Sequence, residues 1–229
     1  YNIMRSLILA LVVVTIIILY YISTIVRIYY NYNKCNNYEF SSTRLNDIYP
    51  TLKAGDIILF KSIITFIHSP LTMGTFFDHV GIVIEKNNQL FILELSDIGT
   101  RLDYDVYSRD NYQIVAPLYE RLQSHHGIVF IMPLEKELEQ WQKQKMLQIS
   151  DVPIEYDTSY FKQLLRGLIP SKCFKKKKVC IEYVGNILHE LQLTDELYDG
   201  FFIQLPKKLL ALQNKPINNN KYLEIIRIN

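Results

Sequence analysis

The stretch from His79 to Leu95 reads HVGIVIEKNNQLFILEL and contains the strongest local structural signal in the chain. Two apolar runs flank Asn87-Asn88, and an Asn pair in this position is typical of the tight turn of a β-hairpin. If these two residues form the centre of the turn, Gly81 is paired with Glu94. The stretch therefore predicts two antiparallel strands, and their register decides which side chains share a face.

The same register places His79 opposite Ser96 and makes His79 and Glu94 diagonal neighbours on one face. A carboxylate at this distance can reach an imidazole ring. Gly81 has no side chain and leaves the space through which Glu94 leans. We therefore expect a His–Glu pair, which a slip of the register by one residue would abolish.

Outside this hairpin, short β-rich runs bounded by Gly, Asn, Asp or Pro predict strands, and later runs with apolar residues at helical spacing predict helices. The further strands are Ile57–Phe60, Tyr112–Ala116 and Gly127–Met132, and the helices are Leu134–Ile149, Thr158–Leu168 and Cys180–Leu193. Strands that cluster first and helices that follow them are typical of an α+β fold.

The composition excludes several classes of protein. The chain has 229 residues, of which 49% are hydrophobic, and a formal net charge of +2. It is too apolar for a disordered chain, and it lacks the basic excess of an obligatory nucleic-acid binder. There is no glycine-rich phosphate loop, no Cys-x-x-Cys pair and no nucleophile elbow. Kinases, zinc ribbons and α/β-hydrolases are therefore disfavoured, and we expect no cofactor and no metal.

An uncharged apolar run covers residues 7–26 and reads LILALVVVTIIILYYISTIV. A helix of about 20 residues can cross a bilayer, and the run is longer than the apolar part of most signal peptides. A signal peptide and a buried core helix are the alternatives. We expect one transmembrane helix, and hence a single-pass membrane protein with the bilayer as a partner. One cation, Arg5, precedes the run, and two, Arg27 and Lys34, follow it. Since positive residues favour the cytosolic side of a membrane, this small excess favours a cytosolic location for the larger C-terminal part.

These features divide the chain into four parts. Residues 1–30 form the anchor, and residues 31–50, which are rich in Asn, Tyr and Ser, form a linker. Residues 51–206 form the folded domain. Residues 207–229 form a tail whose last apolar residues could add an edge strand.

Cys180 precedes the amphipathic run of the last predicted helix, so it lies in the first turn, where the helix dipole stabilises a thiolate. Four lysines, Lys175–Lys178, lie just upstream, and their field could lower the pKa of the thiol further. A nucleophilic cysteine also needs a base. His79 can serve as that base and Glu94 can orient its imidazole, which is the arrangement common to cysteine hydrolases.

Four stretches resemble motifs of the circularly permuted branch of the NlpC-type papain-like cysteine hydrolases, which includes bacterial envelope members, large-DNA-virus members and relatives of lecithin:retinol acyltransferase. They are Lys53–Phe60, Asp78–Ile84, Phe91–Leu95 and Val179–Val184. Their order is informative, because in this branch the histidine strand precedes the cysteine helix. The resemblance implies a permuted papain-like α+β fold, with an antiparallel sheet packed with helices. It also implies a triad of Cys180 as nucleophile, His79 as base and Glu94 as third member.

Other reactive residues have plainer interpretations. His125 and His126 look like a metal pair, but neighbours on an extended chain point to opposite faces, so we interpret them as a surface turn. Cys173 is either a resolving thiol or, more simply, a free surface thiol. Glu182 is either a site residue or a favourable acid in the first turn of a helix. The lysine run beside Cys180 is either a solvated loop or a contact with anionic lipid.

The sequence supports two functions of different classes. The first is a membrane-anchored thiol hydrolase or acyltransferase that acts on amide or ester bonds, with lipid and peptide substrates ranked equally. The second is a catalytically silent structural membrane protein of a virion or envelope, whose partners would be virion proteins. Ile181 favours the second, because family members commonly carry a small hydroxyl residue there. The abundance of Asn, Ile, Lys and Tyr, typical of viral proteins from AT-rich genomes, also favours it.

Overall fold

The computed structural model describes most of the folded part of the chain, which contains one sheet and the helices around it. The described residues are 40–62, 77, 79–95, 108–110, 113–152, 154, 180–195, 212–213, 216, 218 and 220–229, together with scattered residues between 11 and 26.

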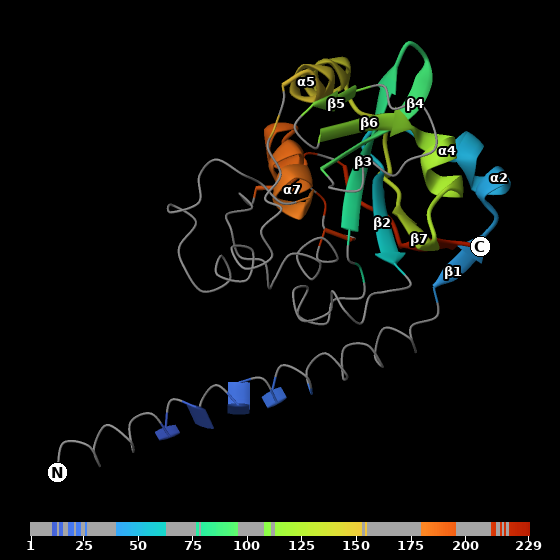
Figure 1. The fold of residues 1–229 in the computed structure, drawn as a ribbon. Coiled ribbons are helices and arrows are strands. Elements are labelled where there is room, and N and C mark those ends of the chain that lie inside the picture. The colour runs from blue at the N-terminus through green and yellow to red at the C-terminus, as the bar shows by residue number, and fades with distance from the viewer. Residues whose placement is uncertain are drawn as a thin grey trace.

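Eight strands of the described part form a single sheet in the order β1-β8-β7-β2-β3-β4-β6-β5 (Figure 1). Their bounds are Ser41–Thr43 (β1), Ile57–Ser62 (β2), His79–Lys86 (β3), Gln89–Leu95 (β4), Ser108–Asp110 (β5), Gln113–Pro117 (β6), Gly127–Met132 (β7) and Ile226–Ile228 (β8). Neighbouring strands are antiparallel except for β1 and β8, which run parallel.

The sheet is therefore mixed, and the prediction of an antiparallel sheet is wrong. The parallel pair joins strands that are far apart in the sequence, with Ser41 paired to Ile226 and Thr43 to Ile228. A tight hairpin imposes antiparallel pairing, but no hairpin connects these two strands, so their direction is set by the rest of the fold. The C-terminal strand also lies between β1 and β7, and not at the edge of the sheet as predicted.

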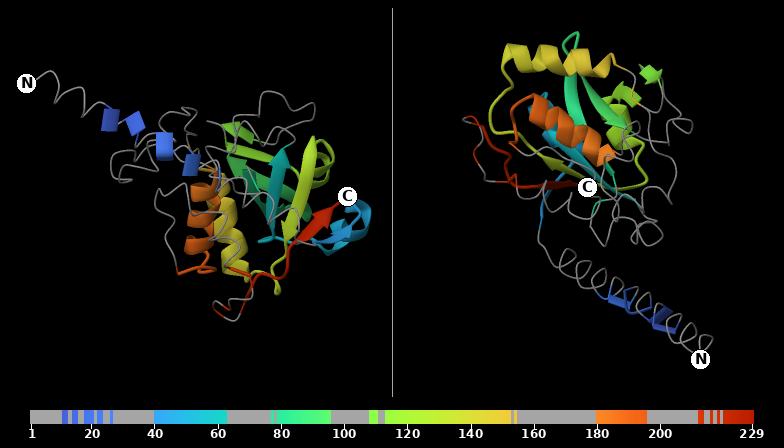
Figure 2. Two further views of the ribbon diagram at one scale, coloured as in Figure 1. Left: turned by 90° about the horizontal axis from the view of Figure 1, so that it is seen from below. Right: turned by 90° about the vertical axis from the view of Figure 1, so that its left-hand side faces the viewer.

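Helices cover both faces of the sheet (Figure 2). The helices α5 (Gln140–Ser150) and α7 (Cys180–Glu190) lie on one face. The short helices α2 (Leu45–Ile48) and α4 (Leu118–Gln123), with a 3-10 turn at Tyr49–Thr51, lie on the other. This arrangement gives the chain two apolar layers, one on each side of the strands.

Strand β2 shows why two layers form. Its successive residues point to opposite faces, as in any strand. Ile57 and Leu59 belong to the apolar cluster under α5 and α7, whereas Ile58 and Phe60 belong to the cluster under α2 and α4. All four are at most 2% exposed, so the strand is buried on both sides and reads as a continuous apolar run.

The central hairpin has the predicted register. Gly81 of β3 is paired with Glu94 of β4, and Asn87 and Asn88 form the turn with φ angles of 54° and 61°. Two consecutive positive φ angles are typical of the hairpin turn whose twist matches that of the strands. A Cβ atom at Gly81 would lie 2.6 Å from Cδ1 of Ile92 and 3.3 Å from Cβ of Glu94. The missing side chain thus leaves room for both neighbours.

The remaining predicted strands are found as β2, β6 and β7, but the helix predicted over Leu134–Ile149 begins only at Gln140. Leu134 is held in an extended segment, because its backbone N–H donates to Asp56 and it forms a β-bridge with Tyr222. Glu139 then caps α5 in a capping box with Gln142. The predicted helix Thr158–Leu168 lies outside the described residues.

The N-terminal prediction also needs correction. Among the described residues, no helix combines the length and the apolar character that crossing a membrane requires, so a transmembrane helix is not supported. Residues 41–51, most of which were assigned to a linker, carry β1, α2 and the 3-10 turn.

Candidate active site

His79 is the first residue of β3, and its side chain is 14% exposed. It is paired across the sheet with Phe60 of β2, and the two ring centroids lie 5.4 Å apart. Phe60 itself is fully buried. One side of the imidazole is therefore covered by an aromatic ring, while part of the side chain remains accessible to solvent.

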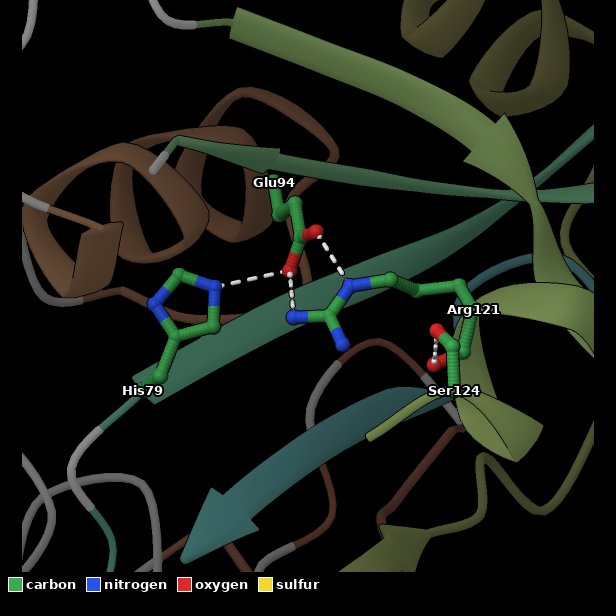
Figure 3. A network of polar contacts seen from close by, with 4 residues as sticks. All are labelled: His79, Glu94, Arg121 and Ser124. Atoms are coloured by element: carbon green, nitrogen blue, oxygen red, sulfur yellow. Dashed lines mark hydrogen bonds and ion pairs between the residues drawn. The ribbon is translucent and has the colours of Figure 1, made fainter. Parts of the chain in front are cut away.

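Glu94 lies on β4 and is completely buried. Its Oε2 lies 2.7 Å from Nε2 of His79, which is the diagonal contact that the hairpin register predicts (Figure 3). A carboxylate without any solvent contact is costly unless charged or hydrogen-bonding partners surround it. The His79 ring supplies one of these partners.

Arg121, which is not among the site residues predicted from the sequence, supplies the second partner. It lies on α4 and is 4% exposed. Its Nε donates to Oε1 of Glu94 at 2.7 Å and its second terminal nitrogen donates to Oε2 at 3.2 Å (Figure 3). A signal was present: the arginine lies between Leu118 and Leu122, on the apolar side of a short helix, where a charged residue is rare unless paired.

The two titratable groups of this network are shifted in opposite directions. Burial would raise the pKa of Glu94, but the Arg121 guanidinium and then His79 outweigh burial and hold that pKa well below its ordinary value. Burial opposes the charged form of His79, but hydrogen bonds with Cys180 and Glu94 outweigh it and raise the pKa of His79. The carboxylate is therefore an anion and the imidazole favours its protonated form.

Cys180 reaches this pair from the other side of the sheet. It is the first residue of α7, is half-buried and free, and packs against the apolar cluster under α5 and α7. It lies near enough to His79 to raise the pKa of the imidazole. Since Nε2 of the ring faces Glu94, the nitrogen left for the sulfur is Nδ1, which points away from the carboxylate (Figure 3). The contact is possible because His79 lies at the end of its strand.

The structure thus brings together all three predicted site residues, Cys180, His79 and Glu94. Glu182 is 8% exposed and lies in the first turn of α7, in keeping with the alternative of a helix-stabilising acid. Cys173 and the lysine run upstream of Cys180 lie outside the described residues.

The histidine pair lies at the connection between α4 and β7. His126 is exposed, whereas the ring of His125 packs against Phe60 at 4.8 Å between centroids. Within the part of the chain that the structure describes, no group of His, Cys, Asp or Glu side chains could hold a metal ion.

A second buried carboxylate, Asp56, lies directly before β2 and is 1% exposed. Its Oδ1 accepts from the backbone N–H of Leu134 at 2.8 Å, and its Oδ2 accepts from that of Lys53 at 3.0 Å. Burial outweighs these two bonds and the charge of Lys53, and raises the pKa of Asp56 to about 6. This carboxylate joins two backbone segments and has no part in the His79 network.

Comparison with known proteins gives little more. No protein-family model matches the chain, and no curated protein matches it. Among solved structures, it is similar to one described as metalloprotein yiiX from Escherichia coli O157:H7, DUF1105. The two are 15% identical with a TM-score of 0.39, over 75% of this chain and 88% of that one. The chemistry of the site therefore has to be derived from its own residues.

Proposed function

We propose that this protein is a thiol hydrolase or acyltransferase that acts on amide or ester bonds. Cys180 is the nucleophile, His79 is the general base and acid, and Glu94 orients the imidazole. The observation that carries the proposal is the contact of Nε2 of His79 with the buried Glu94 carboxylate at 2.7 Å, with Cys180 as the other partner of the ring. Nucleophile, base and orienting group in this order form the usual arrangement of cysteine hydrolases.

The reaction follows from the two ring nitrogens. Nδ1 of His79 takes the proton of the Cys180 thiol, and the thiolate attacks the carbonyl carbon of the substrate. The carbonyl oxygen becomes an oxyanion as the C–S bond forms. The C–N or C–O bond then breaks, and the leaving group takes the proton from Nδ1 of His79. Water, activated by the same nitrogen, or a second acceptor releases the acyl group from the thioester.

The raised pKa of His79 favours a thiolate–imidazolium pair, because the protonated ring stabilises the adjacent sulfur anion. Cys180 is only half-buried and forms no disulfide. The order of the groups along the chain, with the base before the nucleophile, also agrees with the resemblance to permuted NlpC-type hydrolases. No described residue distinguishes lipid from peptide substrates, and membrane localisation and virion partners likewise stay predictions.

The first test is the pH dependence of Cys180 alkylation by iodoacetamide in the full chain, kept in detergent because of the apolar run 7–26. Peptide mass spectrometry separates Cys180 from Cys35 and Cys173. We expect rapid alkylation of Cys180 at neutral pH, because the protonated His79 ring stabilises the adjacent sulfur anion. The His79→Ala variant should lose this reactivity, because the thiolate loses its cationic partner.

His126→Ala is the matched control, because His126 is exposed and lies outside the network. This variant should react like the wild type. An ordinary thiol whose alkylation is the same with and without His79 would refute the proposal, and would favour a structural role for the protein.

Turnover is tested with an activated aryl ester, 4-nitrophenyl acetate. We expect a burst of nitrophenolate, together with an acetyl group on Cys180 that intact-protein mass spectrometry detects before hydrolysis. Cys180→Ala should show neither. Acetylation that persists in Cys180→Ala, or that is absent from the wild type although Cys180 is readily alkylated, would count against acyl transfer.

A further inference from the structure

The guanidinium of Arg121 carries a full positive charge and is buried in the apolar layer under α2 and α4. Its helix neighbours Leu118 and Leu122 are buried, and the carbon at the centre of its guanidinium lies 4.4 Å from the centroid of the Phe60 ring. An arginine over an aromatic face gains cation–π energy, but this interaction alone does not explain a buried cation. The partner that compensates the charge is Glu94.

The contact between Arg121 and Glu94 is bidentate. Nε donates to one carboxylate oxygen at 2.7 Å and a terminal nitrogen donates to the other at 3.2 Å. The second oxygen, Oε2, also faces Nε2 of His79 at 2.7 Å (Figure 3). Both oxygens are thus engaged and the carboxylate cannot rotate without losing a charge-assisted hydrogen bond.

The ring of Phe60 completes the enclosure. It faces His79 across the β2–β3 pair and lies under the Arg121 guanidinium. The carboxylate, the guanidinium and the aromatic ring therefore form one buried unit, and the imidazole is the member that reaches the surface.

We propose that Arg121 is a positioning residue of this site, which holds Glu94 as an anion in one orientation so that Nε2 of His79 stays occupied and Nδ1 faces Cys180. The inference rests on the proposed function for its catalytic meaning. It goes beyond that function because it adds a fourth group that touches neither the substrate nor the nucleophile.

The charges around Glu94 decide what happens when Arg121 is lost. Among the described residues, the charged and titratable groups that face Glu94 are His79 from β3 and Arg121 from α4, with Cys180 from α7 acting through His79. Its paired residues Gly81 on β3 and Ile114 on β6 are uncharged. Removing the guanidinium therefore raises the proton affinity of the whole Glu94–His79 pair.

The test measures Cys180 alkylation against pH in the full chain for the wild type, Arg121→Met and Arg121→Lys. Loss of the cation lets Glu94 take up a proton nearer to neutral pH, and the ring then loses its acceptor. The low-pH side of the alkylation profile, called its acid limb here, should shift to higher pH by about one unit in Arg121→Met. At a given pH on this limb, alkylation is then about tenfold slower than in the wild type. Arg121→Lys keeps the positive charge but cannot form the bidentate contact, so its alkylation rate should lie between those of Arg121→Met and the wild type.

A second measurement shows whether Arg121 acts through Glu94. In a Glu94→Gln background, adding Arg121→Met should not move the profile further. Arg227→Met, which removes an exposed arginine on β8, should leave the profile unchanged. If Arg121→Met does not fold, Arg121→Gln replaces it, because glutamine removes the charge and keeps a hydrogen-bond donor.

Two outcomes would overturn the inference. One is an unchanged acid limb in a folded Arg121→Met variant whose melting temperature alone falls, because the arginine would then serve only packing. The other is an equal shift with and without Glu94. The titration of the His79 ring by NMR separates this failure from that of the proposed function, since it reports on the pair even if Cys180 is unreactive. In Arg121→Met, the change in the ring signals of His79 that accompanies protonation of Glu94 should move to higher pH than in the wild type.

Discussion

Glu94 and Asp56 are both carboxylates with almost no solvent contact, at 0% and 1% exposure, yet their surroundings shift their pKa values in opposite directions. Asp56 accepts from two backbone amides, and burial still raises its pKa to about 6. Glu94 is bound by Arg121 and His79, and its pKa falls. Amide donors are enough to anchor a loop, whereas keeping a buried carboxylate anionic beside a histidine takes a buried cation.

The largest effect should come from replacing one partner of the buried Glu94–Arg121 ion pair. Glu94→Gln leaves the Arg121 guanidinium buried without its counter-ion, and we expect it to lower the free energy of unfolding by about 3–5 kcal/mol. Arg121→Met should also be strongly destabilising. The double variant should cost much less than the sum, because it removes both buried charges. Urea unfolding of the three variants measures this, and strictly additive losses would refute a direct pair.

The raised pKa of Asp56 makes the stability of the protein depend on pH, in the direction opposite to that of a carboxylate with a lowered pKa such as Glu94. The unfolded chain releases this proton near pH 3.8 and the folded chain near pH 6, so the folded state binds more protons in between. The Asp56 contribution to stability should therefore be present below pH 3.8 and lost as pH rises to 6, by up to about 3 kcal/mol. The difference in unfolding free energy between wild type and Asp56→Asn measures it. A difference that stays constant from pH 4 to 6 would contradict the assignment.

A glycine beside each carboxylate allows a matched comparison. Gly55 has a φ of 95° and a Cβ there would lie 2.9 Å from Leu134, while a Cβ at Gly81 would collide with Ile92 beside Glu94. Alanine at either position should cost about 1–3 kcal/mol in thermal unfolding. Only Gly81→Ala should also slow Cys180 alkylation, because it displaces Glu94. Equal slowing by Gly55→Ala would show that alkylation merely follows stability.

The smallest effect is expected for a carboxylate that water reaches. Glu85 of β3 pairs with Lys143 of α5 at 2.9 Å, and the side chains are 34% and 26% exposed. Solvent screens such a pair, so Lys143→Met should change stability by only about 0.2–1 kcal/mol, and less at high salt. If Lys143→Met lowered the free energy of unfolding as much as Glu94→Gln does, burial would not explain the difference in strength between the two ion pairs.

Local signals in the sequence predicted the hairpin well, because a two-residue Asn turn fixes which residues are paired and hence places Glu94 beside His79. They failed where partners come from distant parts of the chain. The start of α5 is delayed because Leu134 is bound to Asp56, which lies 78 residues earlier in the sequence, before β2. The parallel pair of β1 and β8 follows from where the two strands end up in the sheet.

The candidate site shows the same division. The residue types, the β3–β4 register and the His79–Glu94 contact follow from local sequence, because they depend on 17 consecutive residues. The positions of Cys180 and Arg121 follow from tertiary packing instead: α7 brings Cys180 to the start of β3, and α4 brings Arg121 to the other side of Glu94. Both contacts depend on how helices pack on opposite faces of one sheet, and that packing is determined by the whole apolar core.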